Sequence, residues 1–370
     1  DPAGGANNTV RALVLQPDGK ILIGGEFDTM NGISLNHIGR LNPNGDVDSS
    51  FAPGAGPDGL VSSLAARADG KVMAGGTFRT VGTLGRSWVA RFLTKGFVDG
   101  TFSLTAGENA EVLAVAAQPD GKVVVGGAFT TPSGGIARVN SNGSLDVSFD
   151  PDTGADGPVG SLALQPDGKV IIGGQFTKLG GVPRGSIARL QSNGLLDTTF
   201  ASGLGANGPV NSIVRQSDGK ILIAGDFTMV NGVSRNRVAR LDPHGTIDSS
   251  FVPGAGPNGA VQAMALQADG KVFVAGGFTT VSGVARARIA RLLAEGSLDT
   301  GFDPGRGPDN TVYAVAVQPD GNMLIGGAFT TVNGFSRGRI ARLNGDPDAG
   351  STELKVIETV QLTDGQVRLT

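Results

Sequence analysis

Short runs of apolar residues alternate with tight turns along this chain, and the alternation repeats. In the first copy, mostly apolar residues occupy 10–16 and 20–27, and Pro17-Asp18-Gly19 lies between them. Pro fixes φ, Asp bonds its own backbone and Gly accepts a positive φ, so this tripeptide favours a tight turn. The pattern predicts two consecutive antiparallel strands, A and B.

The second half of the same period predicts two more strands. A polar loop at 28–36 is followed by strand C at 37–42. Asn44-Gly45, the strongest short-range hairpin signal, then precedes strand D at 46–51. Residues 52–59 are rich in Pro and Gly and connect to the next copy.

The Asp-Gly pair of the A–B turn recurs at 18–19, 69–70, 120–121, 167–168, 218–219, 269–270 and 320–321, in steps of 51, 51, 47, 51, 51 and 51 residues. A fixed period of four short antiparallel strands is typical of a propeller blade. We therefore predict an all-β, seven-bladed β-propeller of four-stranded antiparallel blades, with a short C-terminal β tail. A β-helix usually has a shorter period, and independent domains of this size would lack disulfides or metal sites to stabilise them.

The predicted propeller covers residues 1–350, with blades near 10–51, 61–102, 112–149, 159–200, 210–251, 261–302 and 312–345. Blade 7 lacks the Asp-x-x-Phe sequence of strand D, and an open blade edge invites aggregation. Residues 351–370 are therefore either the source of the closing strand of blade 7, through part of 353–362, or the start of a following domain. The sequence leaves both interpretations open.

Composition limits the possible functions. The formal net charge of −3 is too small to favour nucleic acid or a membrane surface, and no apolar run is long enough for a transmembrane helix. With two His, no Cys and no paired carboxylates outside the repeat, no acid–base pair is visible. We expect a non-catalytic protein without a metal or cofactor; a hydrolase or lyase with a site at the central mouth is the enzyme alternative.

Residues that recur in every copy indicate folding roles. We expect the last glycine of strand B to allow close packing of blade on blade. We expect Arg of strand C and Asp of strand D to form structural pairs, and the Phe residues that end strands B and D to lie in the core. The glycines are Gly25, Gly76, Gly127, Gly174, Gly225, Gly276 and Gly327.

The copies differ mainly in the B–C loops and the D–A connectors, which share one rim of a propeller. Binding residues concentrate on such variable loops. Six arginines in the B–C loops of blades 5 to 7 would favour an anionic or carboxylate-bearing partner; alternatively, they bond loop carbonyls and Asp226 or Asp303. These arginines are Arg235, Arg237, Arg286, Arg288, Arg337 and Arg339. The residue before the strand B Phe also varies, so Glu26 and Asp226 are further candidates.

The unit Val-x-Ala-x-x-x-Gln-Pro-Asp-Gly-Lys, with Gly-Gly-x-Phe, Ala-Arg-Leu and Asp-x-x-Phe after it, resembles the delta-60 repeat β-propeller family over residues 1 to about 345. The resemblance implies a bacterial setting and an extracellular or cell-surface location, and it brings no catalytic residues. We expect a binding or scaffold module of a longer multidomain protein, with a protein or glycan partner and no nucleic acid. A structural spacer without a ligand is the alternative.

Overall fold

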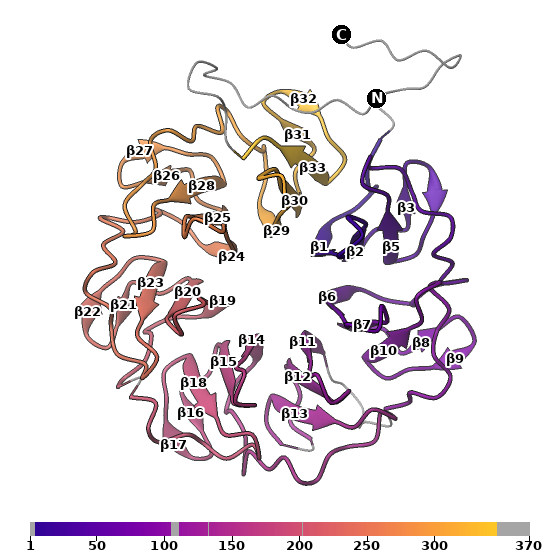
Figure 1. Ribbon diagram of the computed structural model, residues 1–370, viewed down its shortest axis with the longest axis horizontal. Coiled ribbons are helices and arrows are strands. Elements are labelled where there is room, and N and C mark those ends of the chain that lie inside the picture. Colours follow the sequence, from indigo (N-terminus) through magenta and orange to yellow (C-terminus); the bar gives the residue numbers. More distant parts are fainter. Residues whose placement is uncertain (1–3, 105–110, 132, 202, 346–370) are drawn as a thin grey trace.

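The computed structural model describes residues 4–104, 111–131, 133–201 and 203–345. Within these residues, seven three-stranded antiparallel sheets stand around a central axis (Figure 1). In each sheet strand A lies nearest the axis, strand B in the middle and strand C outside it. The predicted seven-bladed, all-β propeller is confirmed.

The strands have nearly the same length in every blade. The A strands are β1 (Val10–Leu15), β6 (Val61–Ala66), β11 (Val112–Ala117), β14 (Val159–Leu164), β19 (Val210–Arg215), β24 (Val261–Leu266) and β29 (Val312–Val317). The B strands are β2 (Ile21–Gly25), β7 (Val72–Gly76), β12 (Val123–Gly127), β15 (Val170–Gly174), β20 (Ile221–Gly225), β25 (Val272–Gly276) and β30 (Met323–Gly327). The C strands are β5 (Ile38–Leu41), β10 (Val89–Phe92), β13 (Ile136–Val139), β18 (Ile187–Leu190), β23 (Val238–Leu241), β28 (Ile289–Leu292) and β33 (Ile340–Leu343).

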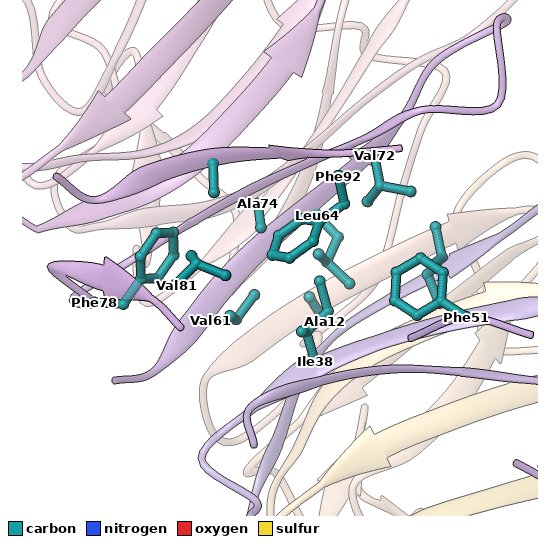
Figure 2. Close-up of a cluster of buried hydrophobic side chains, with 12 residues drawn as sticks. Ala12, Ile38, Phe51, Val61, Leu64, Val72, Ala74, Phe78, Val81 and Phe92 are labelled. Carbon is teal, nitrogen blue, oxygen red and sulfur yellow. The ribbon is translucent and has the colours of Figure 1, made fainter. Parts of the chain in front are cut away.

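The core lies between the blades. Every B strand is buried along its whole length, because neighbouring blades cover both of its faces. Between blades 1 and 2, for example, Ala12 and Ile38 pack with Val61, Leu64 and Phe78 (Figure 2). The Phe residues that end strands B and D are all buried, as expected.

The predicted fourth strand is present in six blades only as a short segment. In blade 1, Val47 pairs with Leu41 through a single bridge, and the corresponding segments of blades 2 to 6 do the same. The segment ends early because Asp48 Oδ1 accepts hydrogen bonds from the backbone N–H and the hydroxyl of Ser50, which turns the chain. The D segment of blade 7 falls outside the described residues.

The B–C loops, expected to be irregular, form small hairpins in six blades; the described residues of the blade 3 loop, which is four residues shorter, form none. These hairpins lie at the circumference of the ring (Figure 1). They pair β3 (Thr29–Met30) with β4 (Ile33–Ser34), β8 (Thr80–Val81) with β9 (Leu84–Gly85), β16 (Lys178–Leu179) with β17 (Val182–Pro183), β21 (Met229–Val230) with β22 (Val233–Ser234), β26 (Thr280–Val281) with β27 (Val284–Ala285), and β31 (Thr331–Val332) with β32 (Phe335–Ser336).

The expected role of the last glycine of strand B was wrong. A Cβ on Gly25 would lie 2.1 Å from the carbonyl oxygen of Thr9 in the same blade. The approach comes from a β-bulge: Val10 pairs with Gly25 and Ala12 with Gly24, so Arg11 is an extra residue. The contact with the next blade belongs to Gly24, whose Cβ would lie 2.7 Å from Val61 Cγ1.

The ring closes within the described residues. Val10 and Leu13 of blade 1 pack against Gly326 of blade 7, and the N–H of Ala6 donates to the carbonyl of Gly338 at 2.8 Å. Arg342 of blade 7 donates to the carbonyl of Pro43 in blade 1. The prediction that part of 353–362 closes blade 7 concerns residues outside the described ranges.

Candidate functional site

The D–A connectors and the B–C loops together form one face of the ring, which we call the variable rim. In the six blades whose B–C loop forms a hairpin, the preceding connector pairs with that hairpin, as Ala155 does with Leu179. Asp156 Oδ1 accepts the backbone N–H groups of Thr177 at 2.7 Å and Lys178 at 2.8 Å. The Thr177 hydroxyl and these N–H groups lower the pKa of Asp156, outweighing the effect of burial. The hairpins are thus fixed to the connectors rather than hanging free.

Three of the six predicted arginines lie on the circumference and bond within their own hairpins. Arg235, Arg286 and Arg337 each donate from Nη1 to the carbonyl of the preceding residue, at 2.9, 2.8 and 2.6 Å. Arg286 is buried, and its Nη1 lies 3.6 Å from Asp303 Oδ1. This bonding matches the loop-carbonyl alternative.

The other three arginines lie directly before strand C, in a left-handed backbone conformation. The φ angles of Arg237, Arg288 and Arg339 are 65°, 63° and 64°. Arg237 Nη1 donates to the carbonyl of Phe227 at 3.3 Å. The corresponding residues of blades 1 to 4 also have positive φ, and they are His37, Trp88, Gly135 and Ser186. The structure therefore separates the predicted arginine arc into two sets.

Glu26 and Asp226 lie where strand B ends beside the start of strand A. The N–H of Glu26 donates to the carbonyl of Thr9 at 2.8 Å, and Asp226 bonds Pro209 in the same way at 2.9 Å. Asp226 Oδ1 is 3.9 Å from Arg237 Nε, so these two predicted residues are brought together.

Glu26 has a partner that the sequence analysis missed. Its Oε1 accepts hydrogen bonds from Arg11 Nη2 at 2.7 Å and Nε at 3.0 Å, and the Arg11 guanidinium lies 4.1 Å from the centre of the Tyr313 ring in blade 7. Arg11 is the extra residue of the strand A bulge, a position that varies from copy to copy. The sequence signal that could have identified this position is its variation among the blades, where the residues are Arg11, Ser62, Leu113, Gly160, Asn211, Gln262 and Tyr313.

A hollow of about 330 Å³ opens on the variable rim where blade 7 meets blade 1. Its lining includes Gly5, Asn7, Thr29, Thr330 and Arg339. Of the predicted residues, Arg339 alone lines this hollow.

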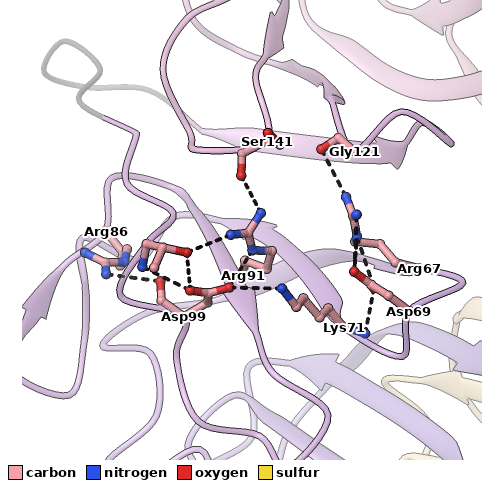
Figure 3. Close-up of polar contacts among 9 residues, drawn as sticks. Arg67, Asp69, Lys71, Arg86, Arg91, Asp99, Gly121 and Ser141 are labelled. Carbon is pink, nitrogen blue, oxygen red and sulfur yellow. Dashed lines mark hydrogen bonds and ion pairs between the residues drawn. The ribbon is translucent and has the colours of Figure 1, made fainter.

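The recurrent Arg–Asp pairs are structural, as predicted, in the six blades whose D segments are described. In blade 2, Arg91 Nε donates to Asp99 Oδ2 at 2.9 Å, and Arg91 Nη1 donates to the carbonyl of Ser141 in blade 3 (Figure 3). Burial raises the pKa of Asp99, but hydrogen bonds from Thr101 and Arg91 outweigh it and lower the pKa to about 2. The pair thus connects two blades as well as two strands.

The described ranges contain no cluster of three or more His, Cys, Asp or Glu residues arranged to hold a metal ion. They also contain no helix long and apolar enough to cross a membrane.

The repeats match a known protein family. The sequence profile of the family described as "Domain of unknown function (DUF5122) beta-propeller" matches residues 16–51, 67–102, 118–149, 165–200, 216–251, 267–302 and 318–346. The chain belongs to the DUF5122 β-propeller family. Sequence comparison with curated proteins gave no match.

Several solved structures resemble this DUF5122 propeller in fold. The WD40 β-propeller domain of Doa1 superposes with a TM-score of 0.57 at 16% identity, covering 88% of this chain and 91% of that chain. The extracellular domain of the hybrid two-component system BT3049 from B. thetaiotaomicron gives 0.56 at 12% identity, covering 94% and 40%. Virginiamycin B lyase from Staphylococcus aureus gives 0.55 at 15% identity, covering 87% and 93%. At these identities the similarity shows the fold alone.

Proposed function

We propose that this DUF5122 propeller is a non-catalytic binding module of a larger exported bacterial surface protein, and that it contacts a protein or glycan partner through the variable rim. The observation that carries the proposal is the difference between the two rims. On the opposite rim each A–B turn repeats the same internal bonds: Gly19 N–H donates to the Gln16 carbonyl at 2.9 Å, and Asp18 Oδ1 accepts the Lys20 N–H at 3.1 Å. These A–B turns keep Asp-Gly in every blade and read Gln-Pro-Asp-Gly in four of the seven.

On the variable rim the side chains differ at three positions in each blade. These are the bulge residue, the residue before the strand B Phe, and the left-handed residue before strand C; in blade 5 they are Asn211, Asp226 and Arg237. The backbone beneath them is the same in each blade, so these changes alter the surface without altering the fold. A fixed frame that carries variable side chains is typical of a binding surface.

The non-catalytic assignment is supported by the pairing of the rim carboxylates. Glu26 bonds Arg11, and Asp226 lies beside Arg237, so each acid faces a cation rather than a second acid or a base. The extracellular setting is supported by the delta-60 resemblance and is compatible with the similar extracellular domain from B. thetaiotaomicron.

Photocrosslinking would test which rim contacts a partner. A photoreactive amino acid placed at Ser234, on the variable rim, should capture a partner from a bacterial surface extract. The matched control at Asn193, in the C–D turn of the opposite rim, should capture none. Capture from Asn193 alone would contradict the proposed rim, and capture from neither position would favour the spacer alternative.

A further inference from the structure

We infer that the hollow between blades 7 and 1 binds a carboxylate of an acidic peptide segment, with Arg339 as the cation that receives it. This inference rests on the proposed binding role and narrows its chemistry. It assigns different roles to arginines that the sequence presents as equivalent.

The lining of the hollow suits an anion. Its volume of about 330 Å³ lies at the lower end of the range for ligand pockets. Thr29 and Ser336 contribute hydroxyl groups and Asn7 contributes an amide, whereas the Thr330 hydroxyl already donates to Asp309 Oδ2 at 2.6 Å. Arg339 is the charged residue among the described lining residues, and none of them is a carboxylate. A negatively charged group in the hollow would therefore meet the Arg339 guanidinium, with no carboxylate among the lining residues themselves.

Two paired backbone segments form the floor of the hollow. Gly5 and Gly338 form a parallel bridge across the blade 7–blade 1 seam. Their backbones approach so closely that a Cβ on Gly338 would lie 2.5 Å from the carbonyl oxygen of Gly4. A preformed floor lowers the entropic cost of ordering a ligand.

Arg339 has no partner for its guanidinium among the described residues. The equivalent residues are bonded: Arg237 to the Phe227 carbonyl at 3.3 Å, and Arg288 to the Pro308 carbonyl at 3.2 Å. Arginine presents a planar set of donors that matches a carboxylate in a bidentate manner. The donors of Arg339 are thus available to a ligand.

Folding does not require an arginine at this position. Arg339 has a φ of 64°, and Gly135 occupies the same place in blade 3 with a φ of 67°. A side chain in this conformation is strained, whereas glycine adopts it freely. The strained backbone at Arg339 therefore lowers the stability of the fold, and no side-chain contact of Arg339 with the described residues compensates for it.

An acidic peptide suits the charge of the hollow. Sugar rings pack on exposed aromatic faces; the Tyr313 ring is covered by Arg11 at 4.1 Å and Trp88 is buried, whereas Phe335, next to Ser336 of the hollow, is exposed. Arginine clusters are a recurring means of recognising acidic peptide motifs. Arg288, which donates one hydrogen bond to the Pro308 carbonyl, lies one seam away on the same rim.

Binding of a fluorescein-labelled hexaglutamate peptide to the full chain tests the inference, with anisotropy as the readout. We expect saturable binding that Arg339→Gln weakens at least tenfold. Arg79→Gln removes the same charge from the same rim on blade 2 and should change the affinity less than twofold. Equal losses in both variants would show that overall charge is being measured and would overturn the site.

Arg339→Gly separates a binding role from a structural one. It should abolish hexaglutamate binding while the melting temperature stays the same or rises, because the strain is relieved. A lower melting temperature together with lost binding would assign Arg339 to folding and overturn the inference. Binding of polygalacturonate in place of hexaglutamate would overturn the peptide assignment.

The two proposals fail separately. If the variable rim still crosslinks a partner while hexaglutamate does not bind, the acidic-peptide inference is wrong and the binding role stands. If the rim crosslinks nothing, the binding role itself is contradicted.

Discussion

Arg189 and Asp197 form a buried ion pair in which Arg189 Nε donates to Asp197 Oδ2 at 2.8 Å. The same guanidinium donates from Nη1 to the carbonyl of Pro243 in the next blade at 2.7 Å. The strand C arginines of blades 1 to 6 each donate to a carbonyl in the C–D turn of the following blade, and Arg342 of blade 7 donates to a carbonyl of blade 1. The strand C arginine thus bonds both within its own blade and to the next blade.

Removing Asp197 should be strongly destabilising. Asp197→Ala leaves the buried guanidinium of Arg189 without its counter-charge, and we expect the free energy of unfolding to fall by about 3–5 kcal/mol. Urea denaturation followed by circular dichroism measures this. Lys169, which also contacts Asp197 but is partly exposed, is the control: Lys169→Met should cost less than about 1 kcal/mol. Similar losses in both variants would contradict a special role for the buried pair.

Stability should fall in acid. In five blades the D-segment aspartate has a lowered pKa. Burial raises this pKa, but hydrogen bonds from Ser or Thr and from Arg outweigh the effect of burial. A Lys side chain adds a further hydrogen bond at each of these aspartates except Asp99. These residues are Asp48, Asp99, Asp146, Asp197 and Asp248. A lowered folded-state pKa gives stability that is complete above the unfolded-state value and is lost as the pH falls through the folded-state value.

For Asp99 this window runs from 3.8 down to about 2. The melting temperature should therefore drop steeply below about pH 4, and Asp99→Asn should have a shallower drop. A melting temperature that is flat between pH 4 and pH 2 would contradict the prediction. Thermal unfolding in buffers of constant ionic strength provides the measurement.

The two glycines that end strand B should respond differently to alanine. A Cβ on Gly174 would lie 2.1 Å from the Pro158 carbonyl oxygen, which the bulge holds in place, so Gly174→Ala should cost about 3 kcal/mol or more. A Cβ on Gly173 would meet only side-chain atoms of Val210 and Ile213, and Ala224 and Ala275 occupy its place in blades 5 and 6. We expect Gly173→Ala to cost less than about 1.5 kcal/mol in urea denaturation. The reverse order would contradict the bulge explanation.

Asp156 should control the opening of one rim hairpin. Asp156→Ala removes the acceptor for Thr177 and Lys178, and bonds to a charged acceptor are worth about 1.5–3 kcal/mol. Amide hydrogen exchange at Lys178 should accelerate about tenfold or more, because local opening becomes easier. Asp167→Ala, in the A–B turn of the same blade, should leave exchange at Lys178 unchanged. Equal protection in both variants would show that the hairpin does not depend on Asp156.

The sequence predicted the blade count and the order of strands correctly, and it failed where two parts of the chain had to be brought together. The D segments matched the strand pattern, yet in blade 1 the hydrogen bond from the Ser50 N–H to Asp48 turns the chain after a single bridge. The B–C hairpins were missed because their two-residue strands are too short to show a period. The bulge at Arg11 was missed because an extra residue can be recognised only by comparing the strand with the strand to which it pairs.

The candidate site was predicted as a set of residue types but not as an arrangement. Arg337 and Arg339 are two residues apart, and the sequence gives no reason to treat them differently. In the structure Arg337 bonds its own hairpin, whereas Arg339 has a positive φ and lines the hollow with Gly5 of the N-terminal connector. The difference depends on a connector more than 300 residues away in the sequence.

The sequence by itself determined the repeat, the turns and the strands, because turn chemistry and apolar pattern act over a few neighbouring residues. Only the tertiary structure decided which glycine meets the next blade, which arginines are bonded and where a hollow opens. Those features arise when the ring closes and places blade 7 against blade 1, since closure brings together residues that no local pattern relates.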